Sequence, residues 1–573
     1  MKPVATLRRR ACPAGASTWP EHVPALLRRV YAARGALGIE HAQPKLAQLL
    51  PPDGLANLDA ATALLDEAIA HDRHVVVVGD FDCDGATACA VGVRGLRMLG
   101  AMRVSHAVPN RIVHGYGLSP ALVDELAALQ PDLLVTVDHG IACHAGIAAA
   151  KARGWQVLVT DHHLPGPALP PADAIVDPSL PDDAFPSKAL AGVGVMFYVL
   201  LALRRRMRTR GAFDGREPDL TALLDLVAVG TVADLVPLDA NNRALVAAGL
   251  RRLRAGQGCA GLHALIEVAG RRAETLTAAD IGFAVGPRLN AAGRLEDMAL
   301  GIECLLTDDA ARARDIATVL NEINGERRAV QQQMTDEAEA AVARVALAGD
   351  AAPAAWCLFD AEWHPGVVGL VASRLKDRVH RPVIAFAPAE PGSERLRGSA
   401  RSIPGFHIRD ALADVAARHP DLIERFGGHA MAAGLSLHRD ALDAFRAAFD
   451  ACAARLLTPE LLQAEVLSDG ELAVEEFTRL HADCLRDGGP WGAGFPEPQF
   501  DGDFDVLSWR PVGDRHLKLE LGCGARRLNA IEFNGWAGTP PPARVRIVFR
   551  LEPDDWRGGD AVQLVIVHRE SAA

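Results

Sequence analysis

Short, strongly apolar runs alternate with amphipathic stretches in the first half of the chain. Residues 75–78 are four consecutive valines, and similar runs occupy 133–137 and 155–160. Continuous apolar runs of this length are typical of strands that are buried on both faces. The segments 55–70 and 89–101 are expected to be helices, and strands that alternate with helices predict a parallel sheet covered by helices.

Acidic and histidine side chains follow each of these predicted strands. They are Asp80, Asp82 and Asp84 after the first, Asp138 after the second, and Asp161, His162 and His163 after the third. In an extended backbone, alternate residues point to the same side, so the first three carboxylates are expected to converge. Taken alone, that acidic segment could equally be an ordinary turn. Because ligands bind beyond the carboxyl ends of parallel strands, the whole set predicts one shared site.

A further acidic residue comes from segment 223–238, where a helix is expected to stop near Gly230 and Asp234 to follow in a turn. By itself Asp234 would be read as a helix cap or turn residue, but beside the other groups a ligand role is favoured. Oxygen and imidazole ligands without thiolate suit Mn²⁺ or Mg²⁺ better than structural zinc. This many carboxylates can hold two ions, which predicts a dinuclear metallohydrolase acting on a phosphate ester.

Composition narrows the class of protein. The chain has 573 residues, 49% hydrophobic and 23% charged, which predicts a globular protein of three or four domains. A formal net charge of −12 argues against coating of nucleic acid by the whole surface, although a local basic groove stays compatible with it.

Cysteine usage and hydropathy indicate the compartment. Ten cysteines without a C-x-x-C pair suit a reducing environment and exclude a disulfide framework or a zinc ribbon. The basic first residues lack the apolar core of a signal peptide, and no run approaches the ~18 apolar residues of a membrane span. We therefore expect a cytoplasmic protein without membrane contact.

The pattern also predicts the domain organisation. The expected parts are a helical N-terminal extension (1–55), the parallel-sheet domain (56–240), a helical region and connector (241–345), a smaller α/β domain (346–455) and an all-β module, most simply a small barrel (456–573). In the last module aromatic and basic residues interleave as single-strand binding requires, although most of the aromatics are expected in the core. They are Trp491, Phe495, Phe500, Trp509, His516, Lys518, Arg526 and Arg527.

The ordered motifs resemble the DHH phosphoesterase superfamily, which is named for the triplet that stands here at 161–163. The more specific signal is the series GDFDCDG (79–85), TVDHG (136–140), TDHH (160–163) and GTVAD (230–234). Later segments are similar to the RecJ family within it, so the resemblance extends from residue 74 to beyond 500. These segments are VPNRIVHGYGLS (108–119), LAGVGVMFY (190–198), GPRLNAAGRLEDM (286–298), WHPGVVGLVASRL (363–375), GSARSIPGFHI (398–408) and FGGHAMAAGLSL (426–437).

The resemblance implies a fold and an activity. The fold would be a parallel-sheet DHH domain linked by long helices to a smaller α/β DHHA1 domain, followed by a C-terminal OB-fold module. The activity would be that of a single-stranded-DNA-specific 5′→3′ exonuclease that uses two Mn²⁺ or Mg²⁺ ions and releases 5′-mononucleotides in DNA repair and recombination. A cleft between the two α/β lobes would be too narrow for a duplex. The implied partners are single-stranded DNA with a 5′ end, a helicase and a single-strand-binding protein, and the chain itself would be a monomer.

The resemblance also implies roles for individual residues. The metal shell would consist of Asp80, Asp82, Asp84, Asp138, His162 and Asp234, with Asp138 bridging the two ions. The catalytic set would be Asp82, Asp84, Asp138, His162 and the outer histidine His163. Substrate contacts would come from Arg111, Ser399 and Arg401 at the 5′-phosphate and from Arg288, Asn290, Arg294 and His429 at the backbone. His139 stands where the family more often has asparagine.

Two alternatives stay open. One is a related DHH phosphodiesterase acting on short oligonucleotides or cyclic dinucleotides, against which the length of the chain and its C-terminal β module argue. The other is a non-catalytic single-strand-binding scaffold built on a decayed DHH domain. Decay should remove ligands, and every expected ligand is present.

Overall fold

A computed structural model of the chain describes residues 5–12, 19–111, 113–347 and 353–572. Within these ranges the chain forms two compact units. The larger comprises residues 9–323 and 468–572, and the smaller comprises 324–467 together with 5–8. No helix in the described ranges combines the length and the apolar character needed to cross a membrane.

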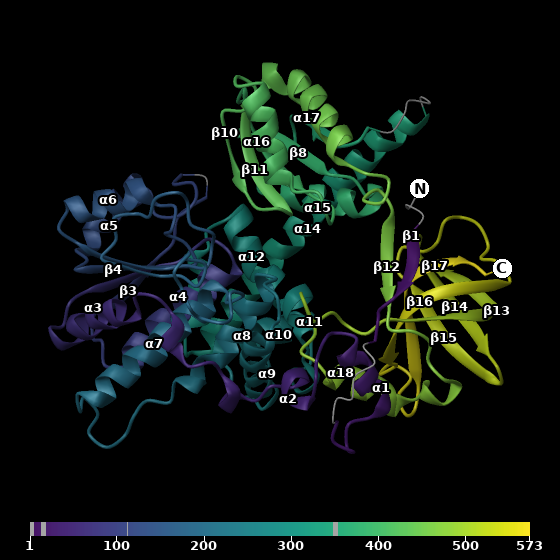
Figure 1. Cartoon of the computed structure of the whole chain (residues 1–573), viewed down its shortest axis with the longest axis horizontal. Helices are drawn as coiled ribbons and strands as arrows, with labels where there is room; N and C mark the ends of the chain where they lie inside the picture. The colour runs from purple at the N-terminus through teal and green to yellow at the C-terminus, as the bar shows by residue number, and fades with distance from the viewer. Residues whose placement is uncertain (1–4, 13–18, 112, 348–352, 573) are drawn as a thin grey trace. The chain divides into compact units, whose positions relative to one another are not determined.

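A five-stranded parallel sheet organises the N-terminal half of the larger unit (Figure 1). Its strands are β2 (Val75–Val78), β3 (Val104–Ala107), β4 (Leu133–Val137), β5 (Gln156–Thr160) and β6 (Ala174–Val176), in the order β3-β2-β4-β5-β6. Every neighbouring pair is parallel, which confirms the prediction from the apolar runs. The chain order reverses at β2, so the crevice between the carboxyl ends of β2 and β4 is where such a sheet binds ligands.

Helices cover both faces of this sheet (Figure 1). Val75 and Val77 pack in one core with α3 (Leu58–Ala70), α4 (Cys83–Met98) and α7 (Gly192–Thr209). Val76 and Val78 pack in a second core with α5 (Pro120–Leu126) and α6 (His144–Ala152). Since successive side chains point to opposite faces, burial of both faces explains why the strand is apolar at every position.

A helical region continues the larger unit and ends in a connector. Its elements are η4 (Leu220–Leu223), α8 (Leu224–Ala233), α9 (Ala240–Arg254), α10 (Ala260–Val268), η5 (Ala273–Thr275), α11 (Ala278–Asp280), the π-helix η6 (Ile281–Val285), α12 (Gly286–Leu295) and α13 (Ala299–Leu306). Helix α14 (Ala310–Leu347) then leads the chain into the smaller unit. The predicted long connector is therefore one continuous helix.

The smaller unit is a mixed sheet with helices. Its strands are β7 (Trp356–Phe359), β8 (Val383–Pro388), β9 (Arg395–Arg401), β10 (Arg425–Gly428) and β11 (Ala432–His438), in the order β10-β11-β9-β8-β7. Only the β7–β8 pair is parallel. Its main helices are α15 (Val368–Val379), α16 (Ile408–Arg418) and α17 (Leu442–Leu456), with the 3-10 turn η7 (Arg439–Ala441).

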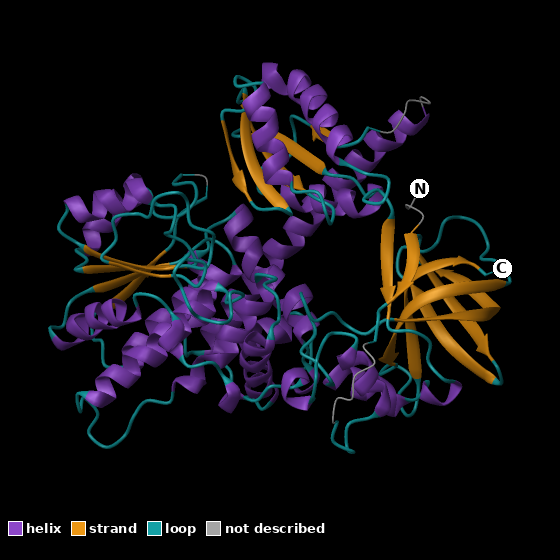
Figure 2. Cartoon of the chain, in the orientation of Figure 1, coloured by secondary structure: helices purple, strands orange, loops and turns teal. Residues whose placement is uncertain are grey.

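The C-terminal part of the larger unit contains a closed five-stranded barrel, which confirms the predicted small barrel (Figure 2). Its strands are β13 (Phe500–Val512), β14 (His516–Cys523), β15 (Arg526–Glu532), β16 (Arg544–Pro553) and β17 (Val562–Ser571), in the order β13-β14-β15-β17-β16. The module is not all-β, because η8 (Val474–Glu476) and α18 (Arg479–Asp487) precede the barrel.

The N-terminal extension differs from the helical segment that the sequence suggested. It does contain α1 (Ala25–Ala32), α2 (Ile39–Ala42), η1 (Leu46–Gln48) and η2 (Pro52–Gly54), but it begins with strand β1 (Ala5–Arg9). This strand pairs with β12 (Ala464–Ser468) in a two-stranded sheet. Five residues are too few to stabilise an isolated helix, whereas an unpaired strand offers backbone partners from a distant part of the sequence.

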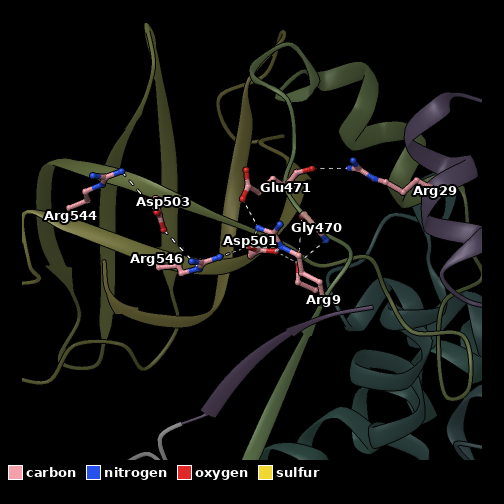
Figure 3. Close-up of polar contacts among 9 residues, drawn as sticks. Arg9, Arg29, Gly470, Glu471, Asp501, Asp503, Arg544 and Arg546 are labelled. Atoms are coloured by element: carbon pink, nitrogen blue, oxygen red, sulfur yellow. Dashed lines mark hydrogen bonds and ion pairs between the residues drawn. The ribbon is translucent and has the colours of Figure 1, made fainter. Parts of the chain in front are cut away.

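Polar contacts tie this extension to the barrel (Figure 3). The carboxylate of Asp501 in β13 is fully buried and accepts hydrogen bonds from Arg9 Nη2 at 2.7 Å, Arg546 Nη2 at 3.2 Å and Ser468 Oγ at 2.5 Å. Burial alone would raise the pKa of Asp501, but these donors hold it below its usual range. Arg29 adds a hydrogen bond of 3.0 Å to the carbonyl of Glu471.

A second buried contact fixes α1 to the same module. Arg34 and Asp469, each with a side chain 1% exposed, form two hydrogen bonds of 2.9 Å. The Tyr31 hydroxyl donates to the carbonyl of Gly488 at 2.7 Å, and its ring lies 5.8 Å from that of Trp491. The part of the extension from Arg9 onward, for which the sequence indicated no role, is thus joined to the C-terminal module within the larger unit.

Replacement of Arg34 tests this attachment. Arg34→Ala would leave the Asp469 carboxylate buried without its bidentate partner, so we expect a loss of about 3 kcal/mol in the free energy of unfolding of this module. Urea unfolding followed by tryptophan fluorescence would measure it. The control is Arg8→Ala, because the Arg8–Glu465 pair is 67% and 49% exposed and should contribute less than about 1 kcal/mol. Equal, small effects of both substitutions would contradict the assignment.

Candidate metal centre

The carboxyl ends of β2, β4 and β5 bring the acidic and histidine side chains into one cluster. Three groups each place their ligand atoms within 4.8 Å of one another: Asp80, Asp82 and Asp138; Asp138, His162 and His163; and Asp84, His162 and Asp234. The groups share Asp138 and His162, so they form a single acid–histidine cluster. It contains all seven residues that the family resemblance placed in the metal shell or directly outside it.

The first three carboxylates converge for a different reason from the one expected. The backbone does not stay extended, because α4 begins at Cys83 with Asp82 as its N-cap, whose Oδ1 accepts a hydrogen bond of 3.0 Å from Gly85 N. Asp84 lies in the first helical turn, where the helix dipole favours a negative charge. The argument from alternating positions in a strand was therefore wrong, although its result, three neighbouring carboxylates, holds.

Helix α8 also differs slightly from its predicted end. It continues three residues past Gly230 to Ala233, and Asp234 is its C-cap residue. A Cβ on Gly230 would lie 2.7 Å from Asp84 Oδ1 and 2.2 Å from the Thr87 hydroxyl. The glycine of the GTVAD motif therefore lets α8 pack closely against Asp84, which brings Asp234 into the cluster.

The N-terminus of α7 holds Asp84 in place. Backbone N–H groups of Gly192 and Val193 donate to its two carboxylate oxygens at 2.6 and 3.0 Å. A Cβ on Gly192 would lie 2.5 Å from the Cβ of Asp138, so only glycine fits this close approach. This segment matches the family pattern, but the pattern alone indicates no role for it. A glycine at the start of a long apolar helix was the signal that could have identified it.

Asp161 organises the two histidines that follow it. Its Oδ1 accepts hydrogen bonds from His162 N at 2.8 Å and His163 Nδ1 at 2.7 Å, and its Oδ2 accepts one from Ile141 N at 2.9 Å. Burial by itself would raise the pKa of Asp161, but the His163 ring and the backbone donors hold it well below the usual range. Burial opposes protonation of His163, yet the bond to Asp161 raises its pKa to about 9.

The residues of the cluster fit a divalent cation. Asp80 Oδ1 is buried and makes no hydrogen bond within the described part of the chain. His162 Nε2 lies 3.1 Å from Asp138 Oδ1 and 3.6 Å from Asp234 Oδ2, so the free nitrogen of the ring faces two carboxylates. Burial, followed by the charge of Asp82, raises the pKa of Asp80 to about 8 and that of Asp84 to about 7. Crowded carboxylates of this kind are stabilised by a cation placed among them. Burial lowers the pKa of His162 to about 4, which keeps its imidazole in the neutral form that binds metals.

His139, the residue that departs from the family pattern, lies behind the cluster. Its side chain is fully buried and its Nε2 is 3.1 Å from the carbonyl of Val78 at the end of β2. Burial lowers the pKa of His139 to about 4. A neutral ring that donates to Val78 ties the end of β4 to that of β2, which supports the crevice between the two strands.

The substrate-binding candidates of the larger unit lie on segments next to the cluster. The guanidinium of Arg111 is 4.1 Å from the centre of the Phe81 ring.

Asn290 Oδ1 accepts a hydrogen bond of 2.9 Å from Cys83 N and so supports the first turn of α4. Arg288 donates to the Ala284 carbonyl at 2.6 Å and to Asn321 Oδ1 at 3.0 Å. The side chains of Asn290 and Arg288 therefore have structural contacts beside any contact with a substrate. Arg294 lies in the last turn of α12.

The remaining candidates belong to the smaller unit. Arg401 Nη1 donates to Ser399 Oγ at 2.9 Å, and both are in β9. A Cβ on Gly369, in the first turn of α15, would lie 2.8 Å from Arg401 Nη2 and 2.9 Å from Ser399 Oγ. The pair therefore sits at the N-terminus of a helix, a position suited to anions. His429 lies in the turn between β10 and β11.

The structure separates the aromatics of the barrel module into core and surface. Phe495 and Phe500 are buried, whereas Trp509 is 39% exposed and stacks on Trp536 with ring centres 5.4 Å apart. The other interleaved candidates are partly or fully exposed: Trp491, His516, Lys518, Arg526 and Arg527. Trp536, in the loop after β15, was not among the sequence candidates, because its stacking partner Trp509 lies 27 residues away in β13.

The sequence analysis also missed Tyr116. Its side chain is 50% exposed, and its ring lies edge-on to Phe81 at 5.9 Å and to His163 at 6.3 Å. The signal was present in the HGYG turn, where a tyrosine stands between two glycines that both have positive φ. An aromatic ring at this place can contact a ligand bound at the acid–histidine cluster.

Family models match three successive parts of the chain. The model described as the DHH family, N-terminal domain, matches residues 74–231, and the DHHA1 domain matches 340–455. The RecJ OB domain matches 468–568. The first match contains the acid–histidine cluster apart from Asp234, which lies three residues beyond its end.

Full-length similarity extends to curated relatives and solved structures. The chain is 49% identical over 577 residues to the single-stranded-DNA-specific exonuclease RecJ of Dickeya dadantii, with 99% of both chains covered. It is similar to the crystal structure of RecJ from Thermus thermophilus in complex with Mn²⁺, with a TM-score of 0.77 and 32% identity over 96% of this chain and 76% of that one. The corresponding Mg²⁺ complex gives a TM-score of 0.72 at 31% identity, over 96% and 75% of the two chains.

Thermal unfolding in the presence of Mn²⁺ tests the metal centre. Because a ligand that binds only the folded state stabilises it, we expect saturating Mn²⁺ to raise Tm by several degrees in the unchanged protein, about 2.7 kcal/mol at a hundredfold excess over Kd. Asp138→Asn should remove most of that shift, since Asp138 belongs to two of the three ligand groups.

The matched control for this experiment is Asp177→Asn. Asp177 is equally buried but belongs to none of the ligand groups among the described residues, and an asparagine there keeps the oxygen that accepts from Ser179 N. This variant should keep the Mn²⁺ shift. A shift that persists in Asp138→Asn, or one that is lost equally in both variants, would refute the assignment.

Proposed function

Because this chain belongs to the RecJ family, we propose that it is a single-stranded-DNA-specific 5′→3′ exonuclease that hydrolyses phosphodiester bonds and releases 5′-mononucleotides. The observation that carries the proposal is the acid–histidine cluster at the carboxyl ends of β2, β4 and β5, in which every ligand expected for the family is present. Burial of several carboxylates in one place costs free energy, and a non-catalytic scaffold would gain nothing that offsets this cost. DNA repair and recombination are the processes that need such an activity.

The proposed cofactors are two divalent ions, Mn²⁺ or Mg²⁺. Crystal structures of Thermus thermophilus RecJ are described with each of these metals. The residues that would hold the ions are Asp80, Asp82, Asp84, Asp138, His162 and Asp234, and the place of Asp138 in two ligand groups supports its role as the bridging ligand. When bound, the ions supply activation of water and stabilisation of negative charge on the scissile phosphate.

The protein's own groups would orient the ligands and move a proton. Backbone donors of α7 hold both oxygens of Asp84 in a fixed direction. Asp161 binds Nδ1 of His163, so Nε2 is the ring atom that can face a substrate. The bond to Asp161 favours the protonated form of His163 by raising its pKa, and we propose that this ring gives a proton to the leaving oxygen as a general acid.

We assign recognition of the 5′-phosphate to Ser399 and Arg401 in the smaller unit. Arg111, in the larger unit, is proposed as a phosphate-binding residue on the grounds of the family resemblance alone. An exonuclease that starts from a 5′ end needs an anion site separate from its metal centre. The Arg401–Ser399 pair beside the N-terminus of α15 supplies a guanidinium and a hydroxyl, which together suit a terminal phosphate. Arg288, Asn290, Arg294 and His429 are proposed to contact the backbone of the strand.

Cysteine usage and the proposed activity suggest the compartment, the partners and the oligomeric state. Ten cysteines without a disulfide suit the reducing cytoplasm. A helicase that produces single strands and a single-strand-binding protein are the partners expected for a nuclease of this specificity. We propose that the chain acts as a monomer, because all the groups assigned to metal and phosphate binding come from one copy.

Release of label from a single strand tests the activity. With a 5′-labelled single-stranded oligonucleotide and Mn²⁺ or Mg²⁺, we expect early release of labelled mononucleotide, little cleavage of a blunt duplex, and a loss of at least about 10³-fold in rate for Asp138→Ala, on the order of the cost of removing one central catalytic contact. Binding without cleavage under either metal would favour the scaffold. Equal cleavage of duplex and single strand would contradict the strand specificity.

Comparison of two 5′ ends tests the phosphate site. The unchanged protein should degrade a 5′-phosphorylated strand with a lower KM than the same strand with a 5′-hydroxyl. Arg401→Ala should raise KM about tenfold for the phosphorylated strand only, because the charge-assisted contact exists only there. Arg397→Ala, which removes an arginine from the same strand β9, serves as the control. An equal rise in KM for both ends would assign Arg401 to the backbone instead.

A further inference from the structure

Phe283 is an aromatic side chain that the fold leaves 84% exposed. It lies in the middle of the π-helix η6, whose neighbouring residues Ile281, Ala284 and Val285 are all buried. Short π-helices are rare and occur often at functional sites. In this turn Ile281, Ala284 and Val285 pack in the core, whereas the Phe283 side chain faces the solvent. An exposed ring gains little stability from burial of apolar surface.

The π-helix borders the acid–histidine cluster. A Cβ on Gly282 would lie 3.6 Å from Val232 Cγ1, and one on Gly286 would lie 3.3 Å from the Cβ of Ala233 and 4.0 Å from Cys83 Sγ. Ala233 directly precedes Asp234, and Cys83 stands between Asp82 and Asp84. Gly282 in η6 and Gly286 at the start of α12 therefore pack against two segments that carry cluster residues. Phe283 lies between these two glycines in sequence, and its side chain is exposed.

The same segment supplies a cation. Arg288 Nη1 donates to the backbone carbonyl of Ala284, the residue that follows Phe283 in sequence, at 2.6 Å. Proteins bind single strands by combining positive charge, which attracts the backbone, with aromatic rings on which the bases stack. The segment from η6 into α12 supplies both within a short stretch of chain. It thus offers, on a segment that packs against the metal centre, the two kinds of group that single-strand binding uses.

We propose that Phe283 is a stacking platform for a base of the single-stranded substrate near the metal centre. The inference rests on the proposed function and adds a residue that distinguishes strands. A base in a duplex is already stacked and paired, so its face cannot reach a protein ring without being unpaired. Phe283 therefore favours single-stranded over double-stranded substrates at the level of binding.

Binding of oligonucleotides in EDTA, where the metal-dependent reaction cannot proceed, tests the proposal. For a fluorescent, 5′-phosphorylated oligothymidylate we expect Phe283→Ala to raise Kd about tenfold, within the range that stacking on one base provides. Phe283→Trp should bind as the unchanged protein does, because it keeps an aromatic face, whereas Phe283→Leu should resemble the alanine variant. In turnover with metal, Phe283→Ala should raise KM and leave kcat within about twofold.

Two controls separate stacking from other effects. Met102→Ala removes an apolar side chain that is also 84% exposed, but Met102 follows the end of α4 remote from the cluster, about 24 Å along the helix axis from Cys83. It should leave Kd unchanged. An oligonucleotide with abasic sites in place of its bases should bind equally to Phe283→Ala and to the unchanged protein.

The outcomes distinguish this inference from the proposed function. If the unchanged protein cleaves single strands but Phe283→Ala binds and cleaves them equally well, the stacking role is refuted and the nuclease assignment stands. If Phe283→Ala raised Kd equally for abasic and for base-bearing strands, stacking would also be refuted. Such a result would show that the substitution changes the surrounding protein backbone instead. If the unchanged protein cleaves no single strand, the proposed function itself fails.

Discussion

Mutual repulsion of carboxylates in one buried volume is the constraint on which the centre of this protein depends. Four aspartates of the cluster have raised pKa values, first because burial disfavours their charged form and then because they face one another. Such a group is stable only if the surrounding structure fixes each side chain and a cation can neutralise the charge. The neighbouring elements supply that fixation through backbone donors.

The positions of glycines follow from this constraint. Helices α7 and α8 approach the cluster through Gly192 and Gly230, where a Cβ would lie 2.7 Å or less from the nearest aspartate atom. Close approach lets the N–H groups of α7 replace the water that a buried carboxylate loses. A similar close approach recurs at the start of α12, where a Cβ on Gly286 would lie 3.3 Å from the Cβ of Ala233.

The N-terminal extension depends on ion pairs with the C-terminal module. Its buried Arg34–Asp469 pair and the Arg9–Asp501 contact join segments more than 400 residues apart in sequence, within one compact unit. Breaking a fully buried pair such as Arg34–Asp469 is strongly destabilising, even where its formation contributes little. The extension therefore fixes the geometry of the C-terminal module rather than adding chemistry of its own.

The sequence by itself determined three strands of the parallel sheet (β2, β4 and β5), the sheet's parallel character, the barrel and the residues of the acid–histidine cluster. It could do so because burial of both sheet faces requires continuous apolar runs, and because parallel strands present their carboxyl ends at one edge. The motifs alone also indicated the family, because their order and spacing can be read directly from the sequence.

Only the tertiary structure decided how the cluster is held and what surrounds it. Asp82 and Asp84 converge through a helix N-terminus, the contacts of Arg288 and Asn290 are partly structural, and Tyr116 and Phe283 are exposed beside the cluster. The pairing of β1 with β12 likewise joins distant segments. These features depend on which elements meet in space and on whether a side chain is covered by a distant segment. Local periodicity carries no information about either, because the contacts that decide them lie far apart along the chain.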